Sequence, residues 1–453
     1  MTAAPDQPAG EPEVLDILGI GFGPSNLALA IAVDEHNRRD PAAALTARFV
    51  ERKPRFGWHR GMLIDDATMQ VSFLKDLVTL RNPCSDFSFV SYLHSKGRLV
   101  DFINHKTLFP LRIEFHDYLE WAAARLDDVV AYDQEATDVE PVVEDGRVVA
   151  FDVATSDRGG RGITVRRARN VVVAAGLAPS LPPEARPGGR VWHNADLLDR
   201  VETLPPSPRR FVVVGAGQSA AEAVEYLHRR FATAEVCSVF TRWGYTPSDD
   251  TPFANRIFDP GAVDAYYGAS EDVKRMLFDY HRNTNYSVVD QDLINELYRR
   301  QYQEKVQGRE RLRILNASRV VAVDPAENEV RVEVEFLPTG ERTTLVADAV
   351  VYATGYRPTD TLRLLGGAAE LARRRPDGAP DIGRDYRVVL DAPADAGIYV
   401  QGATEHSHGI ASTLLSNIAV RSGEIVESVL AHRRASAART PTRATTFAPA
   451  PAL

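Results

Sequence analysis

Cysteine is scarce in this sequence: the chain has only two, Cys84 and Cys237, which lie far apart and form no CxxC pair. This spacing supports neither a disulfide framework nor a structural zinc site, and no metal site is predicted. So few cysteines are typical of a protein in a reducing compartment. We therefore expect a cytoplasmic location.

Positive charge and long apolar runs are lacking as well. The 53 Lys and Arg residues are outnumbered by 62 Asp and Glu, which gives a formal net charge of −9. That balance argues against binding to nucleic acid or to an anionic membrane surface. The sequence contains no run of about eighteen apolar residues, the length that a membrane-spanning helix needs. Residues 1–13 lack the basic and apolar regions of a secretory signal. Small molecules are the expected partners.

The sequence does contain an alternation of short β-branched runs and longer amphipathic stretches, which is typical of an α/β fold. With 453 residues, the chain exceeds one hydrophobic core and is expected to form two or three domains. Strands are predicted at 14–20, 45–51, 170–175, 210–214, 234–240, 347–353 and 397–401. Helices are predicted at 25–33, 116–125, 219–230, 291–307 and 411–432.

The stretch VLDILGIGFGPSNLALAIAV runs from a hydrophobic strand through a glycine turn directly into a helix. Gly21 permits the tight turn, Gly23 lets backbone N–H groups approach a pyrophosphate, and the helix that begins near Pro24 favours its negative charge. Asn26 takes the third small position, where the generic pattern has glycine. Glu51, at the end of the next strand, is placed to accept hydrogen bonds from a ribose 2′-hydroxyl. We expect FAD to bind at this first fingerprint turn.

The same strand–turn–helix pattern recurs in RRFVVVGAGQSAAEAVEYLHRR. Here Gly215, Gly217, Gln218 and Ser219 form a second fingerprint turn and the start of its helix. The end of the following strand carries Arg242 and no acid. A guanidinium pairs with a 2′-phosphate, which an acid would repel, so the sequence predicts NADPH rather than NADH here. The alternative is that Arg242 only covers the surface.

Two further strands end in glycine segments, at 171–176 and 348–356, and such segments mark crossovers between the domains of two-dinucleotide flavoproteins. The predicted architecture is an α/β fold with two Rossmann-like dinucleotide-binding domains, for FAD and NADPH, and a small, mostly helical substrate-binding region. The expected divisions are a disordered N-terminus (1–13), a first FAD-binding part (14–205), an NADPH-binding domain (206–355) with a substrate-binding insertion at about 245–310, a return to the FAD-binding domain with substrate contacts (356–432), and a disordered tail (433–453).

The chain resembles the N-hydroxylating flavin monooxygenases that act on the terminal amine of L-ornithine or L-lysine in siderophore biosynthesis. The resemblance extends from about Leu15 to Glu427, and Asn26 in the first fingerprint turn is part of it. Ornithine hydroxylases are the most similar branch, through FLKDLVTLRNP and TNYSVV. The other segments that carry the resemblance are GIGFGPSNLALA, FPLRIEFHDYLEW, GAGQSAAE, RWGYTPSDDTPFANRIFDP, ATGYRP and HGIASTLLSNIAVRSGEI.

Several site residues are implied by this resemblance. Lys75 would contact the carboxylate of the amino-acid substrate, Asn255 and Asn285 would hold its α-amino and carboxylate groups, and Ser416 would lie near its side-chain amine. Without the resemblance, a snorkelling surface lysine and turn-forming asparagines are the ordinary interpretations. The residues that match flavin-contacting positions are Trp58, His59, Gln70 and Arg112. Gln218 is expected to contact both NADPH and the flavin.

The implied reaction is FAD- and NADPH-dependent N-hydroxylation of the ornithine side-chain amine through a C4a-hydroperoxyflavin, which supplies hydroxamate precursors for siderophores or related natural products. The side-chain amine of free ornithine has a pKa of roughly 10.4, so only about one amine in a thousand is neutral at pH 7. The site should therefore favour the neutral amine by desolvation. One departure bears on the substrate: related sequences often carry an acid two or three residues after the pair His408–Gly409, whereas this chain has Ile410, Ala411, Ser412 and Thr413.

Other functions agree less well with the sequence. L-Lysine is one methylene longer, a difference worth only about 1–3 kcal/mol in a pocket, and a diamine would leave the carboxylate-binding residues without a ligand. A flavin disulfide reductase needs a CxxC pair, and a Baeyer–Villiger or drug-metabolising monooxygenase would lack the NTNYSVV and SFLKDLVTL segments. A flavin-binding sensor or scaffold would show no substrate-stimulated oxygen consumption. The resemblance also implies a homo-oligomer, a tetramer.

Overall fold

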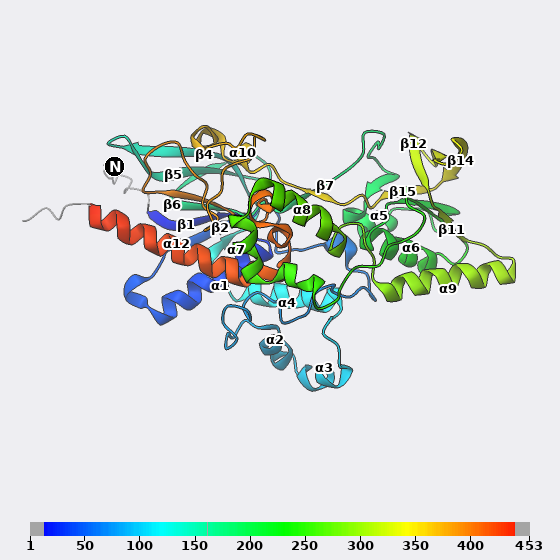
Figure 1. Cartoon of the computed structure of the whole chain (residues 1–453), viewed down its shortest axis with the longest axis horizontal. Helices are drawn as coiled ribbons and strands as arrows, with labels where there is room; N and C mark the ends of the chain where they lie inside the picture. The colour runs from blue at the N-terminus through cyan, green and yellow to red at the C-terminus, as the bar shows by residue number, and fades with distance from the viewer. Residues whose placement is uncertain (1–12, 161, 440–453) are drawn as a thin grey trace, which may run out of the picture.

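The structure is a computed structural model, and it describes residues 13–160 and 162–439. The chain forms two α/β parts that lie next to each other along the long axis of the molecule (Figure 1). The strands of the first part are β1 (Val14–Ile20), β2 (Ala47–Val50), β3 (Val130–Ala131), β4 (Gln134–Glu144), β5 (Arg147–Asp157), β6 (Ile163–Val173) and β17 (Gly397–Val400). Their order is β3-β2-β1-β6-β5-β4, with β17 also beside β6.

In this first sheet, β1 pairs in parallel with β2 and with β6, and β17 pairs in parallel with β6. Strands β4 and β5 are antiparallel and extend one edge. The carboxyl ends of β1 and β17 therefore meet at the same edge of the sheet, which is where a ligand binds in an open α/β sheet. The helices of this part are α1 (Pro24–Arg39), α2 (Phe89–Ser95), α3 (Leu99–His105), α4 (Arg112–Ala124), α10 (Thr361–Leu364) and α12 (Ile418–Arg439).

Helix α1 is buried between the first sheet and α12, with which it packs side by side (Figure 1). Proline suits its first position because that residue needs no N–H partner. The run Leu27–Val33 is buried on every side, and α12 contributes Ile425 and Val429 to the same core. Continuous burial explains why residues 27–33 are apolar on every side and not only along one stripe, whereas the helix ends in polar and charged residues.

The second part is built on the strands β8 (Val191–His193), β9 (Arg210–Val214), β10 (Glu235–Val239), β11 (Leu312–Leu315) and β15 (Ala349–Tyr352). They form a parallel sheet in the order β11-β10-β9-β15-β8. An antiparallel sheet is added by β12 (Ser318–Pro325), β13 (Val330–Phe336) and β14 (Glu341–Ala347). The helices of this part are α5 (Leu197–Val201), α6 (Gln218–Arg230) and α9 (Gln291–Gln307).

Helices α7 (Pro260–Gly268), α8 (Glu271–His281) and α11 (Glu405–His408) lie where the two parts meet, while short 3-10 turns are spread over both parts (Figure 1). The 3-10 turns are η1 (Pro41–Ala43), η2 (Arg60–Met62), η3 (Asp127–Val129), η4 (Asn194–Asp196), η5 (Ala254–Phe258), η6 (Arg282–Thr284), η7 (Gly366–Leu371), η8 (Ile410–Thr413) and η9 (Leu415–Asn417). The helices where the two parts meet therefore come from chain segments that are far apart in the sequence.

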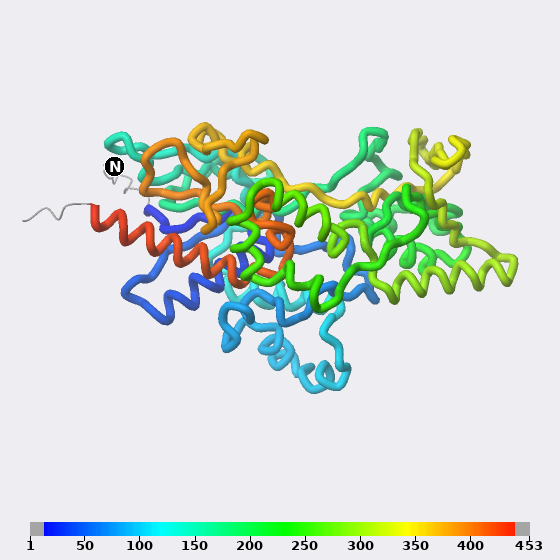
Figure 2. The backbone as a smooth tube through the Cα atoms, viewed as in Figure 1, coloured from blue at the N-terminus to red at the C-terminus, as the bar shows by residue number. Residues whose placement is uncertain are grey.

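The chain crosses between the two parts along a pair of strands, β7 (Leu177–Pro179) and β16 (Tyr356–Pro358). They pair antiparallel with each other, and Figure 2 shows the return crossing as the yellow-to-orange stretch. Strand β7 begins after Gly176 and β16 after Gly355, and both glycines have positive φ, of 73° and 82°. The glycine segments predicted to mark crossovers do so.

The predicted elements agree with the structure at 14–20, 210–214 and 291–307, which are β1, β9 and α9. The single helix predicted at 411–432 is wrong at its start. Residues 410–417 form the two 3-10 turns η8 and η9, because Leu414 is extended and the carbonyl of Ser412 accepts a hydrogen bond from Arg421. The tail prediction is wrong for 433–439, since α12 continues to Arg439.

The C-terminal end of α12 is anchored by its arginines. Arg433 donates to the carbonyls of Ala43 and Ala44, and Arg439 pairs with Asp395 at 2.7 Å. Composition alone did not reveal these partners, which are remote in sequence. The predicted disorder of 1–12 and 440–453 falls outside the described residues. Within 13–160 and 162–439, no helix has both the length and the apolar character that a membrane crossing requires.

Candidate cofactor and substrate site

The first fingerprint turn lies at the carboxyl end of β1, as the sequence predicts. Gly21 has φ +85°, and a Cβ there would lie 2.5 Å from the carbonyl oxygen of Ala174. A Cβ on Gly23 would meet nothing within 4 Å, and no side chain caps the N-terminus of α1 that follows it. The first backbone N–H groups of α1 thus face open space beside a helix dipole. This cradle fits a pyrophosphate.

Asn26 explains why the third small residue of the first turn is not glycine. Its amide donates to the carbonyl of Gly21 at 2.7 Å and accepts from Gln401 at 2.9 Å. Gln401 lies directly after β17, so Asn26 ties the turn to a strand from the other end of the chain. A glycine would leave the buried Gln401 amide without this partner, which costs about 1–3 kcal/mol.

Arg421, on the first turn of α12, continues this network and was not singled out from the sequence. It donates to Gln401 at 3.2 Å, to the hydroxyl of Ser25 at 3.2 Å and to the carbonyl of Ser412 at 2.6 Å. The residue is only 2% exposed, and these three acceptors are all neutral. Burial lowers the pKa of this guanidinium. A buried cation behind the first turn reinforces its fit to an anionic ligand.

Glu51, which is expected to hold a ribose, lies just after β2 and is buried. One carboxylate oxygen accepts from the backbone N–H of Phe22 at 2.8 Å, and the other accepts from that of Lys53 at 2.9 Å. These bonds fix the carboxylate beside the first turn. Each carboxylate oxygen can accept a further hydrogen bond, so a ribose hydroxyl can still be held there.

The residues that match flavin-contacting positions follow β2 in the chain. His59 has a positive φ of 48°, and its ring lies 4.7 Å from that of Trp58 and 5.8 Å from that of Tyr356. His59 is exposed to solvent, and crowding by neighbouring groups together with the cations of Arg112 and Lys53 lowers its pKa from the usual value. Gln70 is exposed. Tyr356 comes from the return crossing, so this group stands where the two parts join.

The second fingerprint turn repeats the first at the carboxyl end of β9. Gly215 has φ +143°, and a Cβ there would lie 2.3 Å from the carbonyl oxygen of Ala353. No side chain caps the N-terminus of α6, in whose first turn Ser219 lies. Arg242, after β10, is exposed and donates to the carbonyl of Ser287 at 2.8 Å. The open helix start and the accessible guanidinium fit a nucleotide with a 2′-phosphate.

Arg112 is held by Glu222, a residue that the sequence did not single out. The pair makes two hydrogen bonds of 2.7 Å, and its side chains are 12% and 5% exposed. Arg112 also donates to the carbonyl of Met62 at 3.1 Å. Gln218 donates to Glu222 at 2.9 Å and accepts from the backbone N–H of Asp290 at 2.8 Å. Both residues therefore lie at the junction of the two parts.

Lys75 is half-buried near the junction, on the side of the first part. Its ammonium lies 5.5 Å from the centre of the Phe258 ring, in η5. Burial lowers the pKa of Lys75, while the carboxylate of Asp259 acts in the opposite direction. The side chain is therefore not a fully solvated surface lysine.

The segments of the other three predicted substrate residues converge on the same place. Phe258 packs in one apolar cluster with Ile410, Leu414 and Tyr286. Asn255 belongs to η5 with Phe258, and its amide donates to the carbonyl of Asp250 at 2.7 Å. The remaining two are Asn285, adjacent to Tyr286, and Ser416, a buried residue of η9.

An acid is present here even though none follows His408–Gly409. Glu405, in α11, accepts hydrogen bonds from the phenol of Tyr286 and from the hydroxyl of Thr413. Burial raises the pKa of the Glu405 carboxyl above its usual value. The acid thus precedes the His–Gly pair, and its partner Tyr286 is remote in sequence. The only sequence signal was a carboxylate in the otherwise uncharged run ATEHSHG.

Two glycine turns that each lead into a helix, one beside the buried acid Glu51 and one near the exposed Arg242, are typical of a two-dinucleotide oxidoreductase. Comparisons with known proteins name the family. Residues 13–358 match the model of the L-lysine 6-monooxygenase/L-ornithine 5-monooxygenase family. The chain belongs to this family.

Individual relatives agree with this assignment. An L-ornithine N(5)-monooxygenase from Burkholderia cepacia is 41% identical over 405 residues, which cover 87% of this chain and 90% of the relative. An ornithine N-hydroxylase from Kutzneria sp. 744, solved with reduced FAD, NADP+ and L-ornithine, superposes with a TM-score of 0.88 at 46% identity, covering 93% and 100% of the two chains. An L-lysine 6-monooxygenase from Pseudomonas syringae gives 0.80 at 33% identity, covering 92% and 99%.

Proposed function

We propose that the protein hydroxylates the terminal side-chain amine of L-ornithine with FAD and NADPH, as a flavin N-monooxygenase that supplies hydroxamate precursors for siderophores or related natural products. One observation carries the proposal: the segment 285–290 joins all three expected binding regions. Its Ser287 and Asp290 are bonded to Arg242 and Gln218 at the second fingerprint turn. Its Tyr286 is bonded to Glu405 on the FAD side of the substrate cluster.

In this arrangement the cofactor and the protein have separate roles. Bound FAD accepts reducing equivalents from NADPH and activates oxygen for transfer to the amine. The protein's own tasks are to orient the amino acid and to keep water away. Lys75 supplies a point cation for the substrate carboxylate, Asn255 and Asn285 supply neutral amides, and the apolar cluster that includes Phe258 keeps water away from the site.

The substrate amine must be neutral when it reacts. An apolar wall formed by Phe258, Ile410 and Leu414 disfavours an ammonium ion, because desolvation lowers the pKa of an amine. The carboxyl of Glu405, with its raised pKa, is engaged by Tyr286 and Thr413. L-Lysine is the second candidate, because the family includes lysine hydroxylases and one methylene is worth only about 1–3 kcal/mol.

The direct test is a side-by-side assay of L-ornithine, L-lysine and putrescine with purified protein, FAD and NADPH. The hydroxylamine product and oxygen consumption are measured together. We expect product with ornithine, little with lysine, and none with putrescine, which has no carboxylate for Lys75. Equal activity on putrescine would refute the carboxylate-binding site, and no product from any of the amines would refute N-hydroxylation.

The role of Lys75 has its own test. Lys75→Ala should raise the KM for ornithine by about 10- to 100-fold, because hydrogen bonds to charged groups contribute about 1.5–3 kcal/mol. NADPH oxidation should continue and release more hydrogen peroxide per turnover. The matched control is Lys96→Ala, which removes a lysine that pairs with Asp117 on the surface. An unchanged affinity for ornithine in Lys75→Ala would show that this lysine does not bind the substrate.

We also propose that the protein acts as a homo-oligomer in the cytoplasm, a tetramer by resemblance to the family. An apolar surface on α3 supports association: the helix buries none of its residues, and Val100 and Ile103 are 69% and 63% exposed. Light scattering on the purified protein measures its mass. A monomer at micromolar concentration would contradict this proposal without affecting the proposed reaction.

A further inference from the structure

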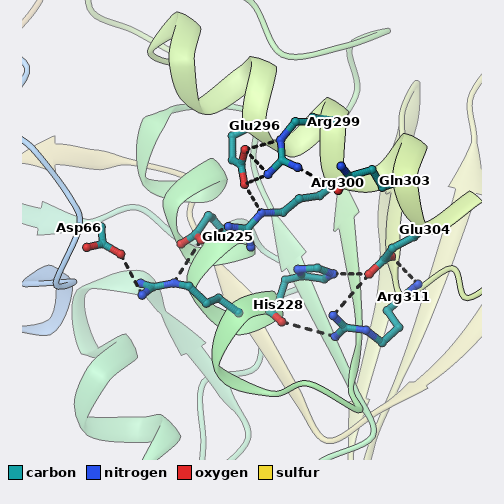
Figure 3. Close-up of polar contacts among 10 residues, drawn as sticks. Asp66, Glu225, His228, Glu296, Arg299, Arg300, Gln303, Glu304 and Arg311 are labelled. Atoms are coloured by element: carbon teal, nitrogen blue, oxygen red, sulfur yellow. Dashed lines mark hydrogen bonds and ion pairs between the residues drawn. The ribbon is translucent and has the colours of Figure 1, made fainter. Parts of the chain in front are cut away.

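Helix α6 connects three regions of the molecule through charged side chains. Glu222 faces the first part, where it binds Arg112 on α4. Farther along, Arg229 pairs with Asp66 of the first part at 2.9 Å. On another side, Glu225 pairs with Arg300 of α9 at 3.0 Å, as Figure 3 shows. The helix that begins at the second fingerprint turn is thus held at several points along its length.

These points differ in what they can influence. Asp66–Arg229 and the α9 contacts lie toward the C-terminal end of α6, together with His228–Glu304 at 2.7 Å (Figure 3). Glu222 lies one turn from the fingerprint, on the same helix face as Gln218. The other ion pairs can therefore hold α6 against its neighbours, while only Glu222 among these residues also touches a residue of the nucleotide turn.

Both ends of the Gln218 amide are fixed. Its nitrogen donates to Glu222 at 2.9 Å, and its oxygen accepts from the backbone N–H of Asp290 at 2.8 Å. The same oxygen of Glu222 accepts from Arg112 at 2.7 Å. Because Arg112 binds Glu222 at two points, the carboxylate has one permitted orientation. The orientation of Gln218 is therefore set from the FAD side of the junction.

We propose that Glu222 is a positioning residue for reduction of the flavin by NADPH. Its carboxylate transmits the position of Arg112 to Gln218, and Gln218 sets where the nicotinamide end of the nucleotide stands relative to the flavin. This inference rests on the proposed use of FAD and NADPH. It goes beyond that use because it assigns the relative placement of the two nucleotides to a buried side chain that links Arg112 to the second turn.

Glu222→Ala tests the proposal in the full-length, FAD-loaded protein. Anaerobic reduction of the flavin by NADPH should slow by about 10- to 100-fold, since misplacement by about 1 Å costs that much. Dithionite needs no docking at the second turn, so it should reduce the variant and the wild type at equal rates. Glu222→Asp should restore part of the NADPH rate, because it keeps the charge on a shorter arm.

Two controls separate positioning from simple loss of an ion pair. Asp152→Asn breaks the two-point pair Arg167–Asp152, at 2.7 and 2.8 Å, which lies within the first sheet. It should leave both reduction rates unchanged. The exchange Arg112→Glu with Glu222→Arg should recover the melting temperature lost in Glu222→Ala but not the NADPH rate, because Gln218 then meets a cation in place of its acceptor.

The outcomes distinguish this inference from the proposed function. Reduction of Glu222→Ala by NADPH at the wild-type rate overturns the inference and leaves ornithine hydroxylation by the wild type unaffected. Equal slowing with NADPH and dithionite also overturns it, since that result indicates a disturbed flavin. Recovery of the NADPH rate in the exchanged pair also overturns the inference, because it shows that an ion pair between the two parts is sufficient whatever Gln218 meets. A wild type that NADPH cannot reduce would instead refute the proposed function.

Discussion

The two fingerprint helices begin in the same way and both bury apolar residues, but α6 makes more ion pairs with other elements than α1 does. Helix α1 is buried along the run Leu27–Val33 and packs against α12. Helix α6 also has an apolar face, but it buries Glu222 and His228 and relies on ion pairs with both neighbouring regions. The turn before α1 is held by a hydrogen bond between the neutral amides of Gln401 and Asn26 and by one from the cationic side chain of Arg421 to Ser25.

This difference suits two cofactors with different residence times. Apolar burial and buried hydrogen bonds give a rigid cradle for a flavin that stays through many turnovers. Ion pairs at a domain junction are more sensitive to local rearrangement, and the nucleotide on that side must enter and leave in each cycle. A shared motif therefore does not imply a shared mechanical role.

Alanine at the first glycine of each turn should produce the largest effect and separate the two roles. Gly21→Ala places a Cβ 2.5 Å from Ala174 O, and Gly215→Ala places one 2.3 Å from Ala353 O, both at positive φ. Strain of about 1–3 kcal/mol comes with the φ alone. We expect Gly21→Ala to purify without FAD. Gly215→Ala should keep its FAD and raise the KM for NADPH on the order of 100-fold.

Flavin content is read from absorbance, and NADPH affinity from initial rates. The matched control is Gly244→Ala, since a Cβ there would meet nothing within 4 Å. If Gly215→Ala also lost its flavin, the two turns would not be independent, and the comparison between them would fail.

Arg421 is the next test of the FAD side. Arg421→Gln should raise the dissociation constant of FAD by about 10- to 100-fold, since hydrogen bonds from a charged donor contribute about 1.5–3 kcal/mol. Arg421→Lys keeps the charge and should lose less. The KM for NADPH should change little in the flavin-loaded fraction. Unchanged FAD affinity in Arg421→Gln would show that this cation does not support the first turn.

Arg242 provides the corresponding test of the NADPH side. Arg242→Ala should raise the KM for NADPH by about tenfold and leave the KM for NADH unchanged, because only NADPH carries the 2′-phosphate. The control is Arg319→Ala, another exposed arginine, which pairs with Glu335 on the three-stranded sheet. A parallel loss with both nucleotides would mean that Arg242 acts only by supporting Ser287.

A further effect concerns acid sensitivity on the FAD side. Burial and the nearby cations of Arg384 and Arg421 lower the pKa of His408 from 6.5 to about 4. The unfolded chain then binds more protons than the folded one between these values, so stability is lost as pH falls through that window. At pH 4, His408 lowers the free energy of unfolding by about 3 kcal/mol relative to neutral pH. Urea unfolding from pH 7 to 4 should show a shallower decline in His408→Gln, and equal declines would contradict the assignment.

Features encoded in neighbouring residues could be predicted from the sequence. Strands β1 and β9, the turns after them and helix α9 each depend on a pattern within about twenty residues. Gly21 and Gly215 were recognisable because only glycine fits a turn with positive φ pressed against a neighbouring strand. The same local logic identified Asn26 as a departure from the generic pattern.

Features that depend on remote partners could not be predicted. The partner of Arg112 is Glu222, 110 residues away, and the partner of Tyr286 is Glu405, 119 residues away. Nothing in the local sequence links either pair. The break between η8 and α12 has the same cause, since the side chain of Arg421 takes the carbonyl of Ser412. The roles predicted for Lys75 and the asparagines stay predictions.

The most direct test of the proposed N-hydroxylation is the stoichiometry of one reaction mixture. Wild-type protein is supplied with FAD, NADPH, oxygen and L-ornithine, and NADPH loss, oxygen loss, hydrogen peroxide and N5-hydroxyornithine are measured together. Coupled N-hydroxylation gives equal amounts of NADPH consumed, oxygen consumed and N5-hydroxyornithine formed, with little peroxide. NADPH consumption matched by hydrogen peroxide, with no hydroxylated ornithine, would contradict it.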